Sequence, residues 1–133
     1  MVIAVDFDGT CVTHEFPKVG KDVGAVPILK TLVEQGHKII LYTMRDDGMK
    51  AFETREGKTY YGNVLEDAVN WFKENNIPLY GINENPKQRY WTESPKVFAD
   101  IYIDDMALGA PLKTSKLSDR PYIDWNKVKE ILL

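Results

Sequence analysis

Cysteine is nearly absent from this chain of 133 residues, which has a single one, Cys11. A lone cysteine cannot form a disulfide within the chain. With two histidines in addition, the chain offers no cysteine and histidine cluster of the kind that binds zinc. Proteins without disulfides are typical of a reducing compartment, so we expect a cytoplasmic protein.

Long apolar runs and a strong charge of either sign are also lacking. No apolar run approaches membrane-spanning length, and an acidic residue at position 6 is not typical of a signal peptide. The net charge of -3 argues against a broadly electrostatic nucleic-acid binder, although it leaves room for a local basic patch. Residues 1–133 suffice for one core, which predicts a single domain with no membrane partner.

Acidic residues gather at the ends of two apolar segments. Residues 2–5 lead into Asp6 and Asp8, and residues 97–103 lead into Asp104 and Asp105. Open α/β sheets bind ligands beyond the carboxyl ends of their strands, and side chains at alternate positions share one side. Four acidic groups there repel one another unless a cation or a proton compensates. The pattern predicts a site for a hard cation, for which Mg²⁺ is the natural choice, although Asp-Gly-Thr alone is also typical of a turn.

A threonine and a lysine also stand directly beside apolar segments. An apolar segment at residues 38–42 ends in the hydroxyl of Thr43, and Lys96 stands directly before the last apolar segment. With the acidic pairs, these motifs resemble the haloacid dehalogenase superfamily of phosphohydrolases and frame nearly the whole chain. The resemblance implies a Rossmann-like three-layer α/β/α sandwich with a mainly parallel sheet. Response-regulator receivers use similar residue types, but they place the phosphorylated aspartate on a middle strand, which here ends in Thr43.

The resemblance implies a chemical role for each motif. Asp6 would be the nucleophile that takes up the phosphoryl group as an aspartyl phosphate, and Asp8 the general acid and base. Thr43 would donate a hydrogen bond to a phosphoryl oxygen. Lys96, with Lys87 as a rival, would balance the negative charge of the group in transfer.

The implied Mg²⁺ ligands are Asp6, Asp8, Asp104 and Asp105. Asp8 would bind the ion through its backbone carbonyl, which leaves its carboxyl group free for proton transfer. Asp104 is the predicted direct ligand of the last pair, and Asp105 either binds through water or orients its neighbours. The residues predicted to contact the substrate are Gly9, Thr10, Met44 and Arg45.

These residues together predict a Mg²⁺-dependent phosphatase. Two alternatives stay open: a phosphotransferase with an acceptor other than water, and a catalytically weak module that keeps the metal site to bind a phosphorylated partner. The intervals between the motifs are too short for the cap domain of many superfamily members. A capless, open site suits a macromolecular phosphoester, or a small substrate enclosed by a neighbouring subunit of a homo-oligomer.

Helices are predicted over residues 23–35, 63–75 and 125–133, and a short strand over residues 79–82. Apolar stripes at helical spacing mark the first two helices. Gly36 ends the first helix, Asn63 and Glu66 form a pattern like a capping box in the second, and Asp124 caps the third. Because strands and helices alternate, we expect a parallel sheet with helices on its faces.

The remaining candidates lie on loops. Residues 46–62 have no predicted helix, and long loops are often binding elements, with a solvated hairpin as the alternative. Trp91 is predicted to cover the core, His14 to sit on a small flap, and His37 to be structural. The candidates for contact with an anionic leaving group are Lys50, Arg55 and Lys58, together with Arg45, and Tyr60 or Tyr61 is the candidate to offer a ring face to the substrate.

Overall fold

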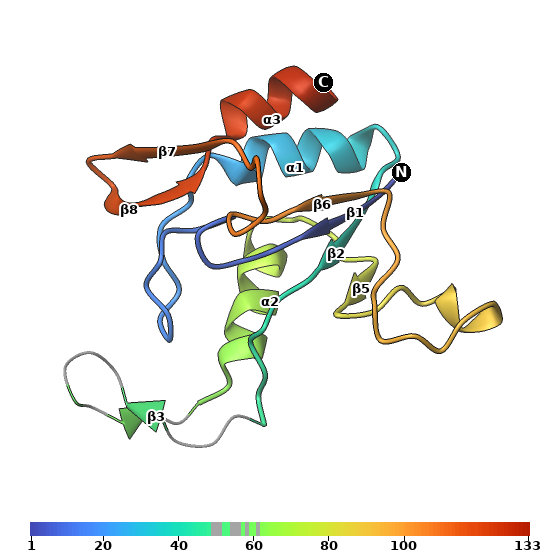
Figure 1. The fold of residues 1–133 in the computed structure, drawn as a ribbon, viewed down its shortest axis with the longest axis horizontal. Coiled ribbons are helices and arrows are strands. Elements are labelled where there is room, and N and C mark those ends of the chain that lie inside the picture. Colours follow the sequence, from blue (N-terminus) through green and yellow to red (C-terminus); the bar gives the residue numbers. More distant parts are fainter. Residues whose placement is uncertain (49–51, 54–56, 58, 61) are drawn as a thin grey trace.

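The computed structural model describes residues 1–48, 52–53, 57, 59–60 and 62–133. It is an α/β fold with a parallel central sheet of four strands in the order β5-β2-β1-β6 (Figure 1). The sheet strands are β1 (Val2–Val5), β2 (Lys38–Leu41), β5 (Gly81–Ile82) and β6 (Ile101–Ile103). The helices are α1 (Ala25–Glu34), α2 (Val64–Glu74) and α3 (Trp125–Leu132).

The helix bounds agree with the predicted ones to within two residues, but their caps differ. Asp22 Oδ1 accepts a hydrogen bond from the N–H of Ala25 at the start of α1, and Asp124 caps α3 as predicted. The side chain of Asn63 makes no capping hydrogen bond, so the predicted capping box of α2 is wrong. Asp47, from the loop after β2, accepts from the first turn of α2 instead, at 2.8 Å from the N–H of Leu65.

The main hydrophobic core lies on one face of the sheet. Val5 of β1 and Leu41 of β2 belong to it, and neither side chain is exposed. All three helices add buried side chains to this same core, among them Leu29 of α1, Phe72 of α2 and Val128 of α3. In Figure 1, α1 and α3 lie side by side over the sheet. The helices therefore share one large core.

The opposite face of the sheet carries a smaller core without a helix. Ala4 and Ile40 pack there with Val97 and Ala99, which precede β6. Among the described residues, no α-helix adds a buried side chain to this cluster. The predicted three-layer α/β/α sandwich is therefore corrected: helices form one outer layer, and the irregular segment that leads into β6, which includes a 3-10 helix at Gln88–Tyr90, covers the other face.

Two antiparallel hairpins stand outside the central sheet. β3 (Phe52–Glu53) pairs with β4 (Thr59–Tyr60) inside the predicted loop, and β7 (Leu112–Ser115) pairs with β8 (Ser118–Ile123) before α3. The second hairpin has no counterpart in the sequence prediction. Of the loop candidates, Lys50, Arg55, Lys58 and Tyr61 lie outside the described residues.

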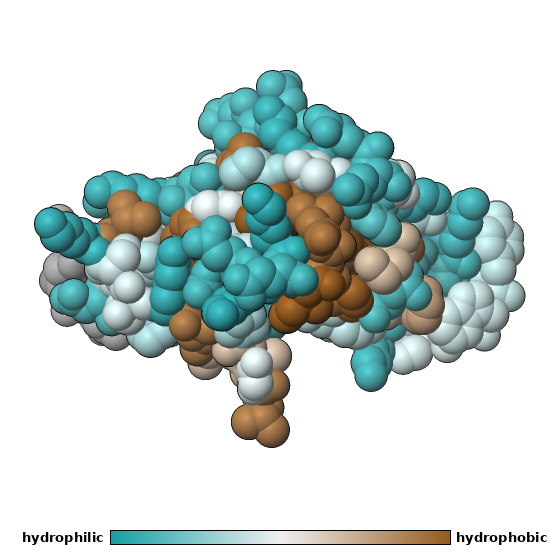
Figure 2. Space-filling view, turned by 90° about the horizontal axis from the view of Figure 1, so that it is seen from above, coloured by the Kyte–Doolittle hydropathy of each residue, from teal (hydrophilic) through white to brown (hydrophobic). Residues whose placement is uncertain are grey.

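The surface seen from above α1 and α3 is mostly hydrophilic, with apolar side chains gathered in a central band (Figure 2). A groove between β6 and α3 has apolar walls that include Ile101, Ile103 and Ile131. Within the part of the chain that the structure describes, no helix combines the length and the apolar character needed to cross a membrane.

Candidate functional site

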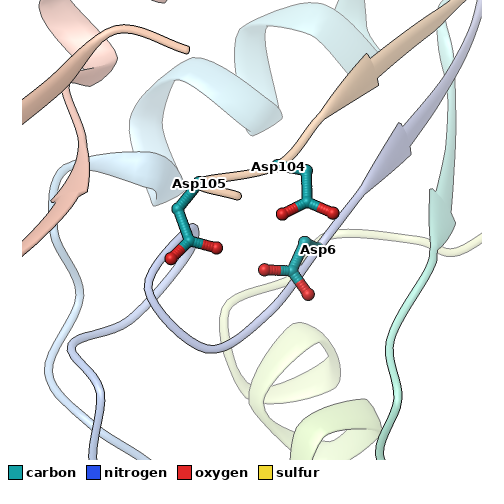
Figure 3. Close-up of side chains that lie close together, drawn as sticks. All are labelled: Asp6, Asp104 and Asp105. Carbon is teal, nitrogen blue, oxygen red and sulfur yellow. The ribbon is translucent and has the colours of Figure 1, made fainter. Parts of the chain in front are cut away.

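Three acidic side chains meet at the carboxyl ends of two neighbouring strands. Asp6 directly follows β1, and Asp104 and Asp105 directly follow β6, which pairs with β1 in the register Val5↔Ile103. The N–H of Asp6 donates to the carbonyl of Ile103 at 2.9 Å, which extends this pairing into the site. Each aspartate offers one carboxylate oxygen, and these oxygens all lie within 4.8 Å of one another (Figure 3).

Burial and neighbouring negative charge make the ionised form of Asp6 unfavourable. Burial, a hydrogen bond with the carboxyl group of Asp105 and the charge of Asp104 raise the pKa of Asp6 to about 8. Hydrogen bonds from the hydroxyl of Thr10 and the N–H of Phe7 act in the opposite direction. A cluster of this kind needs a proton or a cation, and its oxygen ligands fit Mg²⁺ or another hard cation.

Thr10 forms hydrogen bonds with two of these aspartates. Its side chain is fully buried, and its hydroxyl donates to Asp6 Oδ2 at 2.9 Å while it accepts from the N–H of Asp105 at 3.1 Å. Its carbonyl accepts from the indole N–H of Trp125 at 2.7 Å. The structure therefore gives Thr10 the role of positioning the carboxylates, in place of the predicted contact with a substrate.

Gly9 is required where the loop after β1 passes close to the site. Its φ of 79° lies in the left-handed region, and a Cβ atom there would come within 2.0 Å of His14 Nε2 and 2.5 Å of Asp105 Oδ2. Its N–H donates to the carbonyl of Val12, and its carbonyl accepts from the N–H of Ile123. Gly9 thus makes room for side chains of the site, and its backbone groups are already bonded within the protein.

His14 is a site residue that the sequence did not point to. Its Nε2 lies 3.0 Å from Asp105 Oδ2, and 12% of its side chain is exposed. It does lie on the loop after β1, as predicted, but it faces the acidic cluster. The one signal in the sequence is its short distance from Asp8, which is not enough to separate a site residue from a loop residue.

Asp8 stands apart from the three clustered aspartates and pairs with Arg45. Nε of Arg45 donates to Asp8 Oδ2 at 2.8 Å, and Nη2 donates to Asp8 Oδ1 at 2.7 Å. The other guanidinium N–H groups donate to the carbonyls of Pro17, Lys18 and Val64. Arg45 is 2% exposed, and all five of its N–H donors are used within the protein. It therefore holds Asp8 and has no donor left for the predicted contact with a substrate.

A pocket opens beside Asp6 on the sheet face without helices. Its walls include Lys96, which is exposed, together with Tyr42 and Tyr102. Lys87, the predicted rival of Lys96, is not among the residues that line it. The structure thus brings Lys96 to the same pocket as Asp6 and Asp104.

Thr43 and Met44 follow β2 at the same edge of the sheet. Thr43 is half-buried, and its hydroxyl oxygen accepts from the N–H of Arg45 at 3.1 Å, which leaves the hydroxyl proton available to another acceptor. The side chain of Met44 is 97% exposed and contributes to none of the packing described above.

The architecture is shared with a solved bacterial protein. A structure of a conserved protein from Bacteroides thetaiotaomicron matches this chain with a TM-score of 0.73 and 29% sequence identity, over 99% of this chain and 88% of that one. No family model and no curated protein matches the chain. The likeness supports the α/β architecture and brings no activity with it.

Two predictions for residues away from the carboxylates can be compared with the structure. Trp91 does not cover the core: it is 66% exposed and packs edge to face on Phe98, with 5.9 Å between the ring centroids. His37, predicted to be structural, lies at the amino-terminal end of the sheet, where its Nδ1 is 2.9 Å from the amino group of Met1.

Proposed function

We propose that this chain is a Mg²⁺-dependent phosphatase of the haloacid dehalogenase type, which hydrolyses phosphomonoesters through an aspartyl phosphate on Asp6. The observation that carries the proposal is the convergence of Asp6, Asp104 and Asp105 at the ends of β1 and β6, beside a pocket that also holds Lys96. The order of these residues along the chain, with Thr43 after the intervening β2, supports the same assignment.

The first half of the reaction transfers the phosphoryl group to the protein. The phosphate of the substrate enters the pocket, where Lys96 balances its charge. Asp6, Asp104 and Asp105 would hold a Mg²⁺ ion, which would supply further positive charge to the phosphoryl group. A carboxylate oxygen of Asp6 attacks phosphorus, a new P–O bond forms, and the bond to the ester oxygen breaks. Asp8 donates a proton to the departing oxygen, and the hydroxyl of Thr43 donates a hydrogen bond to a phosphoryl oxygen.

The second half of the reaction frees Asp6. Asp8, now ionised, takes a proton from a water molecule that attacks the phosphorus of the aspartyl phosphate. The P–O bond to Asp6 breaks, and inorganic phosphate leaves. In the structure, both carboxylate oxygens of Asp8 accept hydrogen bonds from Arg45. Each proton transfer therefore requires one of these oxygens to leave its hydrogen bond.

The Asp8–Arg45 pair also favours a second candidate function. Both carboxylate oxygens of Asp8 accept hydrogen bonds from Arg45, so the pair fits a catalytically weak module that binds a phosphorylated ligand at the metal site. A phosphotransferase is the third reading, in which an acceptor other than water receives the phosphoryl group.

Phosphate release from an aryl phosphate, with Mg²⁺ or with a chelator, separates these functions. We expect Mg²⁺-dependent turnover by the wild type that is lost in Asp6→Asn and in Asp8→Asn, but kept in Asp119→Asn, which changes an exposed carboxylate of β8. Turnover that survives in Asp6→Asn would contradict the mechanism. Binding of Mg²⁺ without release of phosphate would favour the binding module, and a new phosphoester formed from added alcohol would identify a transferase.

A further inference from the structure

The strand register places two tyrosines beside the acidic cluster on one face of the sheet. Ala4 of β1 is the partner of Tyr102 on β6 and of Ile40 on β2. Because side chains alternate, Tyr42 lies on the same face as Ile40, and Asp6 on the same face as Ala4. Tyr42 is next to Asp6 across the strands, since its N–H donates to the carbonyl of Val5 at 2.9 Å.

The two tyrosine rings form an open aromatic surface over a small residue. Their centroids are 6.2 Å apart, with an angle of 52° between the ring planes. Ala4, the residue between them on β1, is buried and has no side chain beyond its methyl group, which leaves room for the rings. Tyr42 is 36% exposed and Tyr102 is 41% exposed, so the rings keep free surface.

The position of this aromatic surface is fixed by the surrounding structure. The hydroxyl of Tyr102 donates to the carbonyl of Val97 at 2.5 Å, which ties the ring to the segment that covers this face. Both rings line the pocket that contains Asp6 and Lys96. A ligand whose phosphate reaches Asp6 therefore places its next atoms against the tyrosines.

We propose that Tyr42 and Tyr102 select phosphomonoesters in which a flat aromatic ring is attached directly to the ester oxygen. The inference rests on the proposed phosphatase function and adds the substrate class. Neighbouring strands are about 4.8 Å apart, so the aromatic surface begins about one strand spacing away from Asp6. An aryl group can pack on it face to face or edge to face, whereas a polyol would leave hydroxyl groups without partners there.

The test compares phenyl phosphate with glycerol phosphate in the presence of Mg²⁺. We expect the ratio of their kcat/KM values to fall about tenfold in Tyr42→Ala and in Tyr102→Ala, because an aromatic contact of the usual strength is lost. Tyr42→Phe keeps the ring and should keep the ratio. Tyr90→Ala is the matched control, since Tyr90 is 89% exposed. Thermal melts identify any variant that has unfolded.

Each outcome separates the substrate preference from the proposed function. A ratio that is unchanged in both alanine variants, or a wild type that prefers glycerol phosphate, overturns the inference while the phosphatase remains. If wild type hydrolyses neither ester, the phosphatase proposal fails, and calorimetric binding of phenylphosphonate and methylphosphonate to the Mg²⁺-loaded protein decides the preference. Tighter binding of phenylphosphonate that is lost in the alanine variants supports it, and equal binding overturns it.

Discussion

Replacing Asp6 with asparagine tests the electrostatics of the carboxylate cluster. The pKa of Asp6 is raised from 3.8 to about 8 by burial and by the carboxyl groups of Asp105 and Asp104. Between these values the folded, metal-free protein holds a proton that the unfolded chain releases. The free energy of unfolding should therefore fall as the pH rises from about 4 to about 8, by up to about 1.4 kcal/mol per pH unit.

The size of the effect follows from the same shift. A difference of about four pKa units corresponds to a loss of at most about 6 kcal/mol in the free energy of unfolding at pH 8. Asparagine has nearly the same shape and no charge, but its amide replaces one oxygen that accepts hydrogen bonds. We expect metal-free Asp6→Asn to exceed the wild type in unfolding free energy by about 1–3 kcal/mol at pH 8, and to show little gain at pH 4. Added Mg²⁺ should stabilise the wild type more than the variant, which lacks one ligand.

Urea denaturation followed by tryptophan fluorescence measures these differences, because Trp71 and Trp125 are both buried. The titration is run at pH 4 and pH 8, with a chelator and with Mg²⁺. Asp119→Asn is the control for the loss of an exposed carboxylate, and it should keep the pH dependence of the wild type because it retains Asp6. The reasoning is refuted if Asp6→Asn is less stable than the wild type at pH 8 without metal, or if its gain is equal at both pH values.

Three further substitutions test contacts around the site. His14→Ala should lower the affinity for Mg²⁺ about tenfold in calorimetry, because Asp105 loses the partner that orients it; an unchanged affinity would contradict this role. Arg45→Ala should lower the free energy of unfolding in urea by about 3 kcal/mol, since a buried ion pair is broken, and Asp8→Asn in the same chain should recover part of the loss. Asp47→Ala should cost about 1 kcal/mol and speed amide exchange in the first turn of α2, whereas unchanged exchange would show that the cap contributes nothing.

The parts of the fold that the sequence predicted are those set by local patterns. Asp6 and Asp104 each follow an apolar segment directly, so their place at strand ends needed no knowledge of distant contacts. Gly36 and Asp124 mark helix ends through their own backbone and side-chain preferences. The hairpin of β7 and β8 was missed because its strands are polar and β8 contains Pro121, which is uncommon in strands.

The parts that the sequence did not predict depend on partners far apart in the chain. Asp47 caps a helix that begins seventeen residues later, which resembles no local capping pattern. Arg45 was read as a substrate contact because it follows a strand end, but its partner Asp8 is 37 residues away. Tyr42 and Tyr102 meet only because β1 separates β2 from β6 in the sheet.

The hydrogen bonds of Arg45 join the loop after β1 to the carboxylate of Asp8. Two of them end on the carbonyls of Pro17 and Lys18, in the loop between β1 and α1, and two end on the carboxylate of Asp8. Loss of the first two bonds would remove two of the contacts that hold the guanidinium against Asp8. Arg45 therefore makes the position of the Asp8 carboxylate depend on the position of this loop.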